Sequence, residues 1–123
     1  MRYLGIDYGT KKVGLALSDE SGTLAFPHSV VPTKGDLQDT VFKLLETEGI
    51  NEVVIGHSLD HDGTENPIMK KVYIFKKALE EKEYIVHLEP EFLTTFQAKR
   101  NTEDAMADAA AAALILQSFL DKD

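Results

Sequence analysis

The 123-residue chain has no cysteine. Without cysteine there is no disulfide framework, no thiolate nucleophile and no cysteine-ligated zinc, and a reducing compartment suits such a chain. Long apolar runs are also lacking, since the longest, residues 109–116, falls far short of the roughly 20 residues that cross a bilayer. Behind Arg2, Asp7 interrupts any secretory pattern. We therefore expect a cytoplasmic protein with no membrane segment.

Basic residues are scarce. Lysine and arginine number 13 against 21 aspartates and glutamates, which gives a net charge of −8. Nucleic-acid binding is driven by neutralisation of phosphates, so a polyanion partner would need local basic patches, metal ions or both. The hydrophobic fraction of 43% is that of an ordinary globular chain. The length fits one domain over residues 1–123.

Strand and helix patterns alternate along the chain. Alternating apolar residues between turns predict three strands in the first third, and Pro27 restricts the third of them to a sheet edge. Further on, helical periodicity alternates with buried, β-branched runs. The expected elements are strands at 2–8, 12–18 and 23–31, a helix capped by Asp36 and ended by Gly49, a strand at 52–56, a helix from Asn66-Pro67 to about Lys82, a strand at 84–88 and a helix from about Thr102 to Leu120.

This β-β-β-α-β-α-β-α order predicts an α/β fold, because hairpins followed by right-handed crossovers give a mixed five-stranded sheet flanked by helices. Functional crevices in such sheets lie beyond the carboxyl ends of the parallel strands. Asp7 ends the first strand, residues 57–62 follow the fourth, and Glu89 and Glu91 follow the fifth. All of them are therefore expected near one rim of the sheet.

Asp7 lies in the motif Gly5-Ile6-Asp7-Tyr8-Gly9-Thr10. Glycines at 5, 9 and 14 permit a tight turn and the close approach of a phosphate or of a second backbone. The alternative is a turn-forming aspartate that hydrogen-bonds its own backbone. The surrounding glycines favour a functional acid, held rigidly at the end of its strand.

Asp108 projects from the apolar side of its helix. At about 100° per residue it shares a stripe with Ala112 and Ile115, and a buried carboxylate needs a partner, a proton or a metal. Small side chains at 109–113 would let the helix approach the sheet and bring Asp108 toward Asp7. Plain helix propensity also accounts for these alanines.

Either Glu89 or Glu91 alone would be an ordinary solvated loop acid, given how often acids occur at surfaces. Convergence with Asp7 and Asp108 favours a function for one of the two. Three carboxylates on one rim repel each other unless a divalent cation joins them, and oxygen ligands suit Mg²⁺ or Mn²⁺. A pair of such ions about 3.5–4 Å apart activates water and stabilises the leaving oxygen in phosphodiester hydrolysis.

The loop at residues 57–63 contains His57 and His61, which suggests a transition-metal site. A four-residue spacing fixes ligand geometry on a helix, however, and not in a loop. A turn at Asp62-Gly63 that borders the crevice is the better interpretation.

Lysines gather in two places. Lys11 and Lys12 follow the Asp7 turn, next to the expected site, and are candidates for phosphate contacts. A second set lies on the helix after Pro67. For these lysines a solvated helix face is a better interpretation than a nucleic-acid groove: Lys70, Lys71, Lys76, Lys77 and Lys82.

These motifs jointly resemble the YqgF/RuvX family, the RuvC-like proteins also described as pre-16S rRNA nucleases or Holliday-junction-resolvase homologues. The resemblance covers nearly the whole chain. Its parts are Gly5-Ile6-Asp7-Tyr8-Gly9-Thr10-Lys11-Lys12-Val13-Gly14-Leu15-Ala16, Val53-Val54-Ile55-Gly56 with Asp62-Gly63, Glu91 before Leu93-Thr94-Thr95, and Asp108 ahead of Ala111-Ala112 and Ile115-Leu116-Gln117.

The resemblance implies an RNase H-like fold. It places the family's metal-binding acids on Asp7, Glu91 and Asp108, and so selects Glu91 over Glu89. The implied activity is hydrolysis of phosphodiesters in structured nucleic acid, either the precursor of 16S rRNA or branched DNA, by a monomer or homodimer that uses two Mg²⁺ or Mn²⁺ ions. Asp7 would bridge the ions, while substrate contacts are expected from Gly9, Thr10, Lys11, Lys12, Thr94 and Thr95.

The chain departs from the family's pattern beside the expected site. The family's Asp-Glu-Arg reads Pro90-Glu91-Phe92, its Gly-Leu-Pro reads Gly56-His57-Ser58, and the segment between Thr95 and Asp108 is short. These departures favour a second hypothesis, a catalytically weak or inactive nucleic-acid-binding module on the same fold. A third, an ATPase or sugar kinase, rests on residues 5–10, but such enzymes need a second lobe that 123 residues cannot supply.

Overall fold

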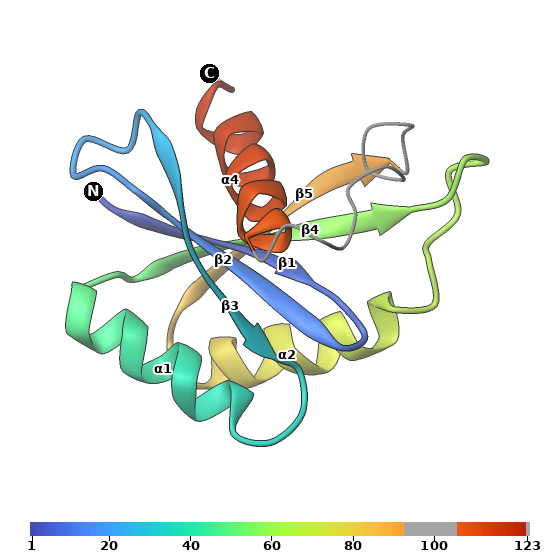
Figure 1. Ribbon diagram of the computed structural model, residues 1–123, viewed down its shortest axis with the longest axis horizontal. Coiled ribbons are helices and arrows are strands. Elements are labelled where there is room, and N and C mark those ends of the chain that lie inside the picture. The colour runs from blue at the N-terminus through green and yellow to red at the C-terminus, as the bar shows by residue number, and fades with distance from the viewer. Residues whose placement is uncertain (93–105, 123) are drawn as a thin grey trace.

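Figure 1 presents the computed structural model of the chain. It describes residues 1–92 and 106–122, and for Glu91 and Phe92 it describes the backbone alone. The elements are β1 (Tyr3–Tyr8), β2 (Lys12–Ser18), β3 (Ala25–Pro32), α1 (Leu37–Glu48), β4 (Glu52–Leu59), α2 (Met69–Glu81), β5 (Ile85–Phe92) and α4 (Ala107–Leu120). Their order is the predicted β-β-β-α-β-α-β-α.

The five strands form one mixed sheet in the order β3-β2-β1-β4-β5. The hairpins β1–β2 and β2–β3 pair antiparallel, whereas β1–β4 and β4–β5 pair parallel. The sequence predicts a mixed five-stranded sheet, and the structure places β1 at its centre. The carboxyl ends of β1, β4 and β5 therefore meet at one rim.

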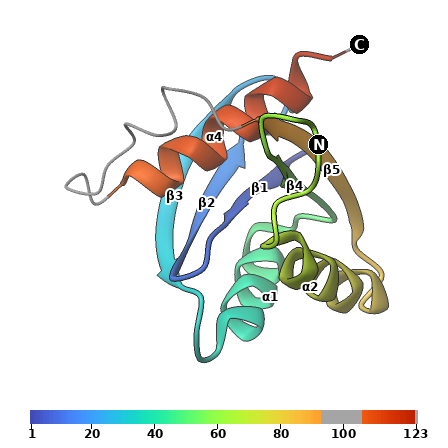
Figure 2. The same ribbon diagram turned by 90° about the vertical axis from the view of Figure 1, so that its right-hand side faces the viewer.

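Helices cover both faces of the sheet: α1 and α2 lie on one face and α4 crosses the other (Figure 2). Because alternate residues of a strand point to opposite faces, each strand supplies both cores. The α1/α2 side includes Leu4, Ile6, Val13, Leu15, Val41, Leu45, Val53, Ile55, Val72, Phe75 and Leu79. The α4 side is smaller and contains Ala16, Val54, Ala112, Ala113, Ile115 and Leu116.

Two strands extend beyond their predicted ends. β4 continues to Leu59 rather than stopping at Gly56, and β5 continues to Phe92 rather than Leu88. The two strands pair along this extension, from Gly56 opposite Glu89 to Leu59 opposite Phe92. The expectation that a loop begins directly after Gly56 was therefore wrong, because residues 57–59 belong to β4. Pro90 is tolerated because β5 is an edge strand, where a missing N–H breaks no second ladder.

Gly49 ends a helix as predicted, but α2 begins at Met69, with Ile68 as its N-cap residue, rather than at Asn66-Pro67. Gly49 ends α1 in the left-handed conformation, with φ of 67°, and the Asn66 Oδ1 atom accepts a hydrogen bond from the Ile68 N–H just before α2. Asp36 occupies the N-cap position of α1, but its side chain makes no capping hydrogen bond. α4 is described from Ala107, and the predicted start near Thr102 lies outside the described residues.

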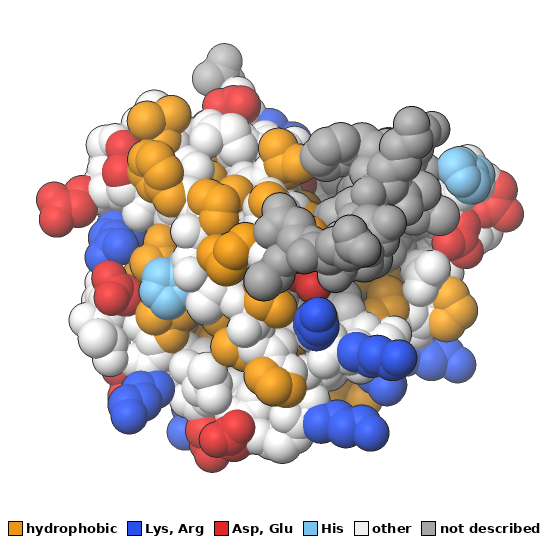
Figure 3. All heavy atoms as spheres, viewed as in Figure 1, with side chains coloured by type: hydrophobic (Ala, Val, Ile, Leu, Met, Phe, Trp, Pro, Cys, Tyr) orange, Lys and Arg blue, Asp and Glu red, His pale blue; other side chains and the backbone are white. Residues whose placement is uncertain are grey.

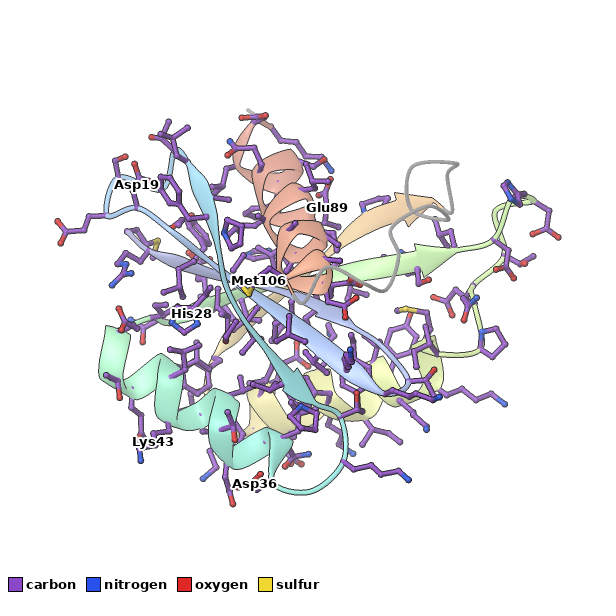
Figure 4. The ribbon with its side chains drawn as sticks, viewed as in Figure 1. Asp19, His28, Asp36, Lys43, Glu89 and Met106 are labelled. Atoms are coloured by element: carbon purple, nitrogen blue, oxygen red, sulfur yellow. The ribbon has the colours of Figure 1, made fainter. Side chains whose placement is uncertain are left out.

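The β3 edge contains a bulge. Leu15 pairs with Ser29 and Ala16 with Pro27, so His28 is an extra residue without a partner across the ladder (Figure 4). This confirms the prediction that the strand with Pro27 is an edge strand. No helix in the described part of the chain has the length and apolarity needed to cross a membrane.

Candidate active site

Asp7 is the penultimate residue of β1, the central strand of the sheet. Only 9% of its surface is exposed. It lies at the carboxyl-end rim, where the sequence predicts a functional acid. The residues beside it on the neighbouring strands determine which groups this carboxylate can contact.

Gly14 of β2 lies directly opposite Asp7 in the antiparallel pair. Residues in opposite positions point to the same face of a sheet, so the missing side chain of Gly14 leaves space beside Asp7. α4 fills that space with its own backbone. A Cβ atom built on Gly14 would lie 1.9 Å from the Asp108 carbonyl oxygen and 2.8 Å from the Ala109 nitrogen. The Asp7–Gly14 pair and the Asp108 backbone are thus in contact range.

Small residues line this contact on both sides. Gly5, two residues before Asp7 and therefore on the same face, would carry a Cβ only 2.7 Å from the Leu116 Cβ atom. On the helix, Ala109 and Ala112 are completely buried. The expected close approach of α4 to the sheet is confirmed, and the second backbone that the glycines admit is that of α4.

Asp108 is half-buried and is the second residue of α4. A helix starting near Thr102 would put it beyond the first turn, but in the described helix it lies within that turn. There the helix dipole favours a negative charge.

The register of the sheet shows which residues of β4 and β5 lie level with Asp7, in one row across the strands. Ile6 pairs with Ile55, which pairs with Leu88, so the following row contains Asp7, Gly56 and Glu89. Neighbouring strands are about 4.8 Å apart, which puts the Asp7 and Glu89 backbones about 10 Å apart. The middle position is a glycine with no side chain, so only the two acids contribute side chains to this part of the row.

Glu89 is not the solvated loop acid that was considered. It is 3% exposed, and its two carboxylate oxygens accept hydrogen bonds of 2.8 Å from the Oγ of Ser118 in α4 and from the Nζ of Lys122, two residues after α4 (Figure 4). A charge buried this deeply needs such partners. Glu89 therefore anchors the carboxyl end of α4 to the edge of the sheet.

Glu91 lies in β5 opposite Ser58 of β4. Since alternate residues of a strand share a face, position 91 falls on the same face as Glu89, two residues nearer the rim. Its side chain is not described, so its place among the ligands stays a prediction. Thr94 and Thr95 lie outside the described residues.

Four of the predicted substrate contacts lie at the β1–β2 connection: Gly9, Thr10 and Lys11 in the turn, and Lys12 as the first residue of β2. Thr33 fixes this turn, because its Oγ1 donates to the Gly9 carbonyl over 2.8 Å and its N–H donates to the Lys11 carbonyl over 3.0 Å. Thr10, Lys11 and Lys12 are exposed. Lys12 is two residues from Gly14 and so points to the face that holds Asp7.

His57 belongs to β4 and not to a loop. Its Nε2 lies 2.8 Å from a Glu65 carboxylate oxygen, which also accepts a hydrogen bond from the Tyr73 hydroxyl. These contacts, that of Tyr73 first, lower the pKa of the Glu65 carboxyl. The predicted turn at Asp62-Gly63 is present, with Gly63 at φ of 86°.

Side chains that ligate metals form no group of three or more among those described. The set of three acids that the sequence predicts is not tested by this, because the Glu91 side chain is not among them. The structure does show that Gly14 contacts both parts of the proposed site: it pairs with Asp7 in the sheet, and the Asp108 backbone packs against it.

The fold is that of the RNase H-like resolvases. Thermus thermophilus RuvC, solved in complex with a Holliday junction substrate, superposes with a TM-score of 0.58 over 98% of this chain and 96% of that chain, at 18% identity. The fowlpox virus Holliday junction resolvase superposes with a TM-score of 0.56 over 98% of each chain, at 13% identity. Identities this low establish the fold alone.

Sequence relatives define the family. A family model described as "RuvX: Holliday junction resolvase" matches residues 1–122. A protein of Nitratidesulfovibrio vulgaris is 37% identical over 98% of this chain and 93% of its own length, and one of Anaplasma marginale is 40% identical over 98% and 84%. Both bear the name "Putative pre-16S rRNA nuclease". The chain belongs to the RuvX family, which confirms the resemblance of its motifs.

Proposed function

We propose that this chain is a divalent-metal-dependent endonuclease that hydrolyses phosphodiester bonds in structured nucleic acid, with the precursor of 16S rRNA as its substrate. The observation that carries the proposal is the contact at Gly14, which brings the first turn of α4 against the strand pair that holds Asp7. The name of the relatives from N. vulgaris and A. marginale supports the substrate. The RuvX family model supports the nuclease class.

The chemistry of the candidate donors fits Mg²⁺ or Mn²⁺. All three proposed ligands, Asp7, Glu91 and Asp108, are carboxylates, which these hard cations prefer. Asp7 is nine-tenths buried and held by the central strand, so it is oriented before a cation arrives. Asp7, Glu91 and Asp108 would together hold such ions.

When bound, such ions activate water and stabilise the leaving oxygen of a phosphodiester. The chain's own residues do the rest. The β1–β2 turn presents Lys12 on the face of Asp7, where its ammonium group binds a phosphate oxygen, and Thr10 and Lys11 are exposed beside it. Thr33 holds this turn in place through two hydrogen bonds, so the phosphate is positioned by a fixed loop.

The decisive test is a nuclease assay on RNA and on branched DNA with Mn²⁺. We expect Asp7→Asn and Asp108→Asn each to reduce cleavage at least about 100-fold, since losing a metal ligand removes several kcal/mol of transition-state stabilisation. The matched control is Asp39→Asn. Asp39 also lies in the first turn of a helix, α1, but on the opposite face of the sheet. Cleavage that is equal in all four proteins would refute the assignment.

A second candidate function is that of a nucleic-acid-binding module with weak or no catalysis. It is favoured by Pro90, which occupies an exposed position in β5 immediately before Glu91, where the family has an acid. In that case the wild type binds structured RNA but releases no cleavage product with Mg²⁺ or Mn²⁺, and its cleavage rate equals that of Asp7→Asn.

A further inference from the structure

Five exposed lysines lie around the carboxyl end of β1. Lys11 and Lys12 come from the β1–β2 turn, Lys34 from the loop between β3 and α1, and Lys70 and Lys71 from the start of α2. We name this set the lysine face. Figure 3 shows Lys and Arg side chains gathered at the lower right, over this part of the molecule.

Three contacts make the lysine face continuous. The Thr33 N–H donates to the Lys11 carbonyl over 3.0 Å, which puts Lys34 beside the turn. The ring of Tyr8, just before the turn, lies 5.5 Å from that of Phe75, one helical turn after Lys71. Finally, Thr33, Gly35 and Lys71 line one cavity of about 380 Å³.

Local stability does not account for these lysines. Lys70 and Lys71 lie in the first turn of α2, which contains no acid, and the helix dipole disfavours positive charge there. Within residues 1–90 and 106–122, none of the five makes an ion pair. Other lysines do: Lys76 pairs with Glu80, and Lys122 with Glu89.

The nearby acids leave the face basic. Asp36 and Asp39 line the same cavity, but both belong to the beginning of α1. Of the five lysines, Lys71 lines this cavity beside the two acids, and the other four lie outside it, where they form a local excess of positive charge in a chain whose net charge is −8. Such a local excess is what a polyanion partner requires.

We infer that the lysine face binds the phosphate backbone of a duplex arm that continues past the cleaved bond, an inference that rests on the proposed function. Lys12 points to the face of Asp7 and connects the two regions. From there the arm passes around the β1–β2 turn to Lys34, Lys70 and Lys71, on the α1/α2 side of the sheet. The sequence analysis favours a solvated face for Lys70 and Lys71, and the inference assigns them phosphate contacts instead.

The test measures binding without cleavage. Asp7→Asn protein in EDTA is titrated with a duplex of about 20 base pairs, two helical turns, at several salt concentrations. The variant Lys34→Gln/Lys70→Gln/Lys71→Gln is compared with a control, Lys43→Gln/Lys76→Gln/Lys77→Gln. Both triple variants lose the same charge, and both alter α2 twice, but the control positions lie outside the lysine face.

We expect the first triple variant to bind roughly 10- to 100-fold more weakly and to lessen the slope of log K against log salt by about 3, since each phosphate contact contributes about 0.9. The control should change affinity by less than about threefold, through the general field alone. RNA and DNA duplexes should respond alike, because both present phosphates. Equal losses in the two triple variants, or no loss in either, would overturn the inference.

Cleavage of a short structured substrate, whose duplex arm ends before the lysine face, separates this inference from the proposed function. If the inference alone fails, the wild type cleaves and the first triple variant binds the duplex normally. If the proposed function alone fails, no protein cleaves, yet the difference in duplex binding remains. If both hold, the first triple variant cleaves the short substrate normally and a substrate with a long duplex arm with a raised KM.

Discussion

Gly14 controls the distance between α4 and the sheet at the candidate site. A methyl group there would overlap the Asp108 carbonyl oxygen, at 1.9 Å. That oxygen belongs to the backbone, so the clash is relieved only by moving α4. We expect Gly14→Ala to lower the free energy of unfolding by at least about 3 kcal/mol, at the upper end of overpacking effects, and to reduce cleavage. Urea denaturation and the nuclease assay measure the two effects.

Gly49→Ala is the control for this substitution. Gly49, at the end of α1, has φ of 67° and no neighbour within 4 Å of an added Cβ atom, so the variant strains the backbone by about 1–2 kcal/mol and displaces nothing. Its cleavage rate should stay at the wild-type level. A Gly14→Ala protein that is as stable and active as Gly49→Ala would show that α4 need not approach this closely.

Local patterns were sufficient to single out Asp7 and Asp108. The glycines around Asp7 and the helical stripe that contains Asp108 both lie within a short stretch of sequence. The residues around Glu89 and Glu91 could not decide which of the two is functional, because their environments depend on α4 and on pairing with β4, which are distant in sequence. The role of Glu89 in particular requires Ser118 and Lys122, and no spacing rule connects a strand to them.

At the scale of elements, α4 is held at both ends of its path across the sheet. Its first turn rests on Gly14, and its carboxyl end is tied to β5 through Glu89 and Lys122. The Glu89 side chain is only 4% exposed, against 57% for Lys122. We expect a double-mutant cycle of Glu89→Gln and Lys122→Gln to give a coupling of about 1–2 kcal/mol, typical of a hydrogen bond to a buried charge.

Lys76 and Glu80 provide the comparison. They are four residues apart on α2, with 26% and 45% of their side chains exposed, and such pairs couple by about 0.3–0.5 kcal/mol. Urea unfolding of the Glu89/Lys122 variants and of the corresponding Lys76/Glu80 variants measures the two coupling energies. Equal coupling in the two cycles would mean that burial of Glu89 adds nothing to the attachment of α4.

The order of the elements and the mixed character of the sheet were predictable because hydrophobic periodicity is a local signal. The lengths of β4 and β5 were not. The extra residues of each strand are stabilised by the other, from Gly56–Glu89 to Leu59–Phe92, and neither segment has an apolar pattern that signals this pairing. Proline at 90 even argues for a strand end, and it is accepted only because β5 has no neighbour on its outer side.

At the scale of the whole molecule, the charge of −8 makes cations part of the proposed chemistry. We expect calorimetric titration to detect Mn²⁺ binding at millimolar concentrations or below. Asp7→Asn and Asp108→Asn should weaken this binding, because each removes a proposed carboxylate ligand, whereas Asp39→Asn should not. Absence of Mn²⁺ binding by the wild type would favour the binding module over the nuclease.

The same charge shows how far composition alone can lead. An acidic chain argues against binding a polyanion in general, yet the lysine face is a region where lysines from three segments gather. Its members are separated in the sequence by residues 13–33 and 35–69. Only the folded arrangement of the β1–β2 turn, Lys34 and α2 shows that they belong together.

Finally, the prolines of the sheet bear on self-association. Pro27 and the extra residue His28 interrupt the β3 edge, and Pro90 interrupts the β5 edge. An interrupted edge cannot offer another chain an unbroken row of donors and acceptors, so the sheet is protected from edge-to-edge aggregation during folding. A homodimer of this chain would accordingly be built from helix surfaces or loops, and not as one ten-stranded sheet shared between two copies.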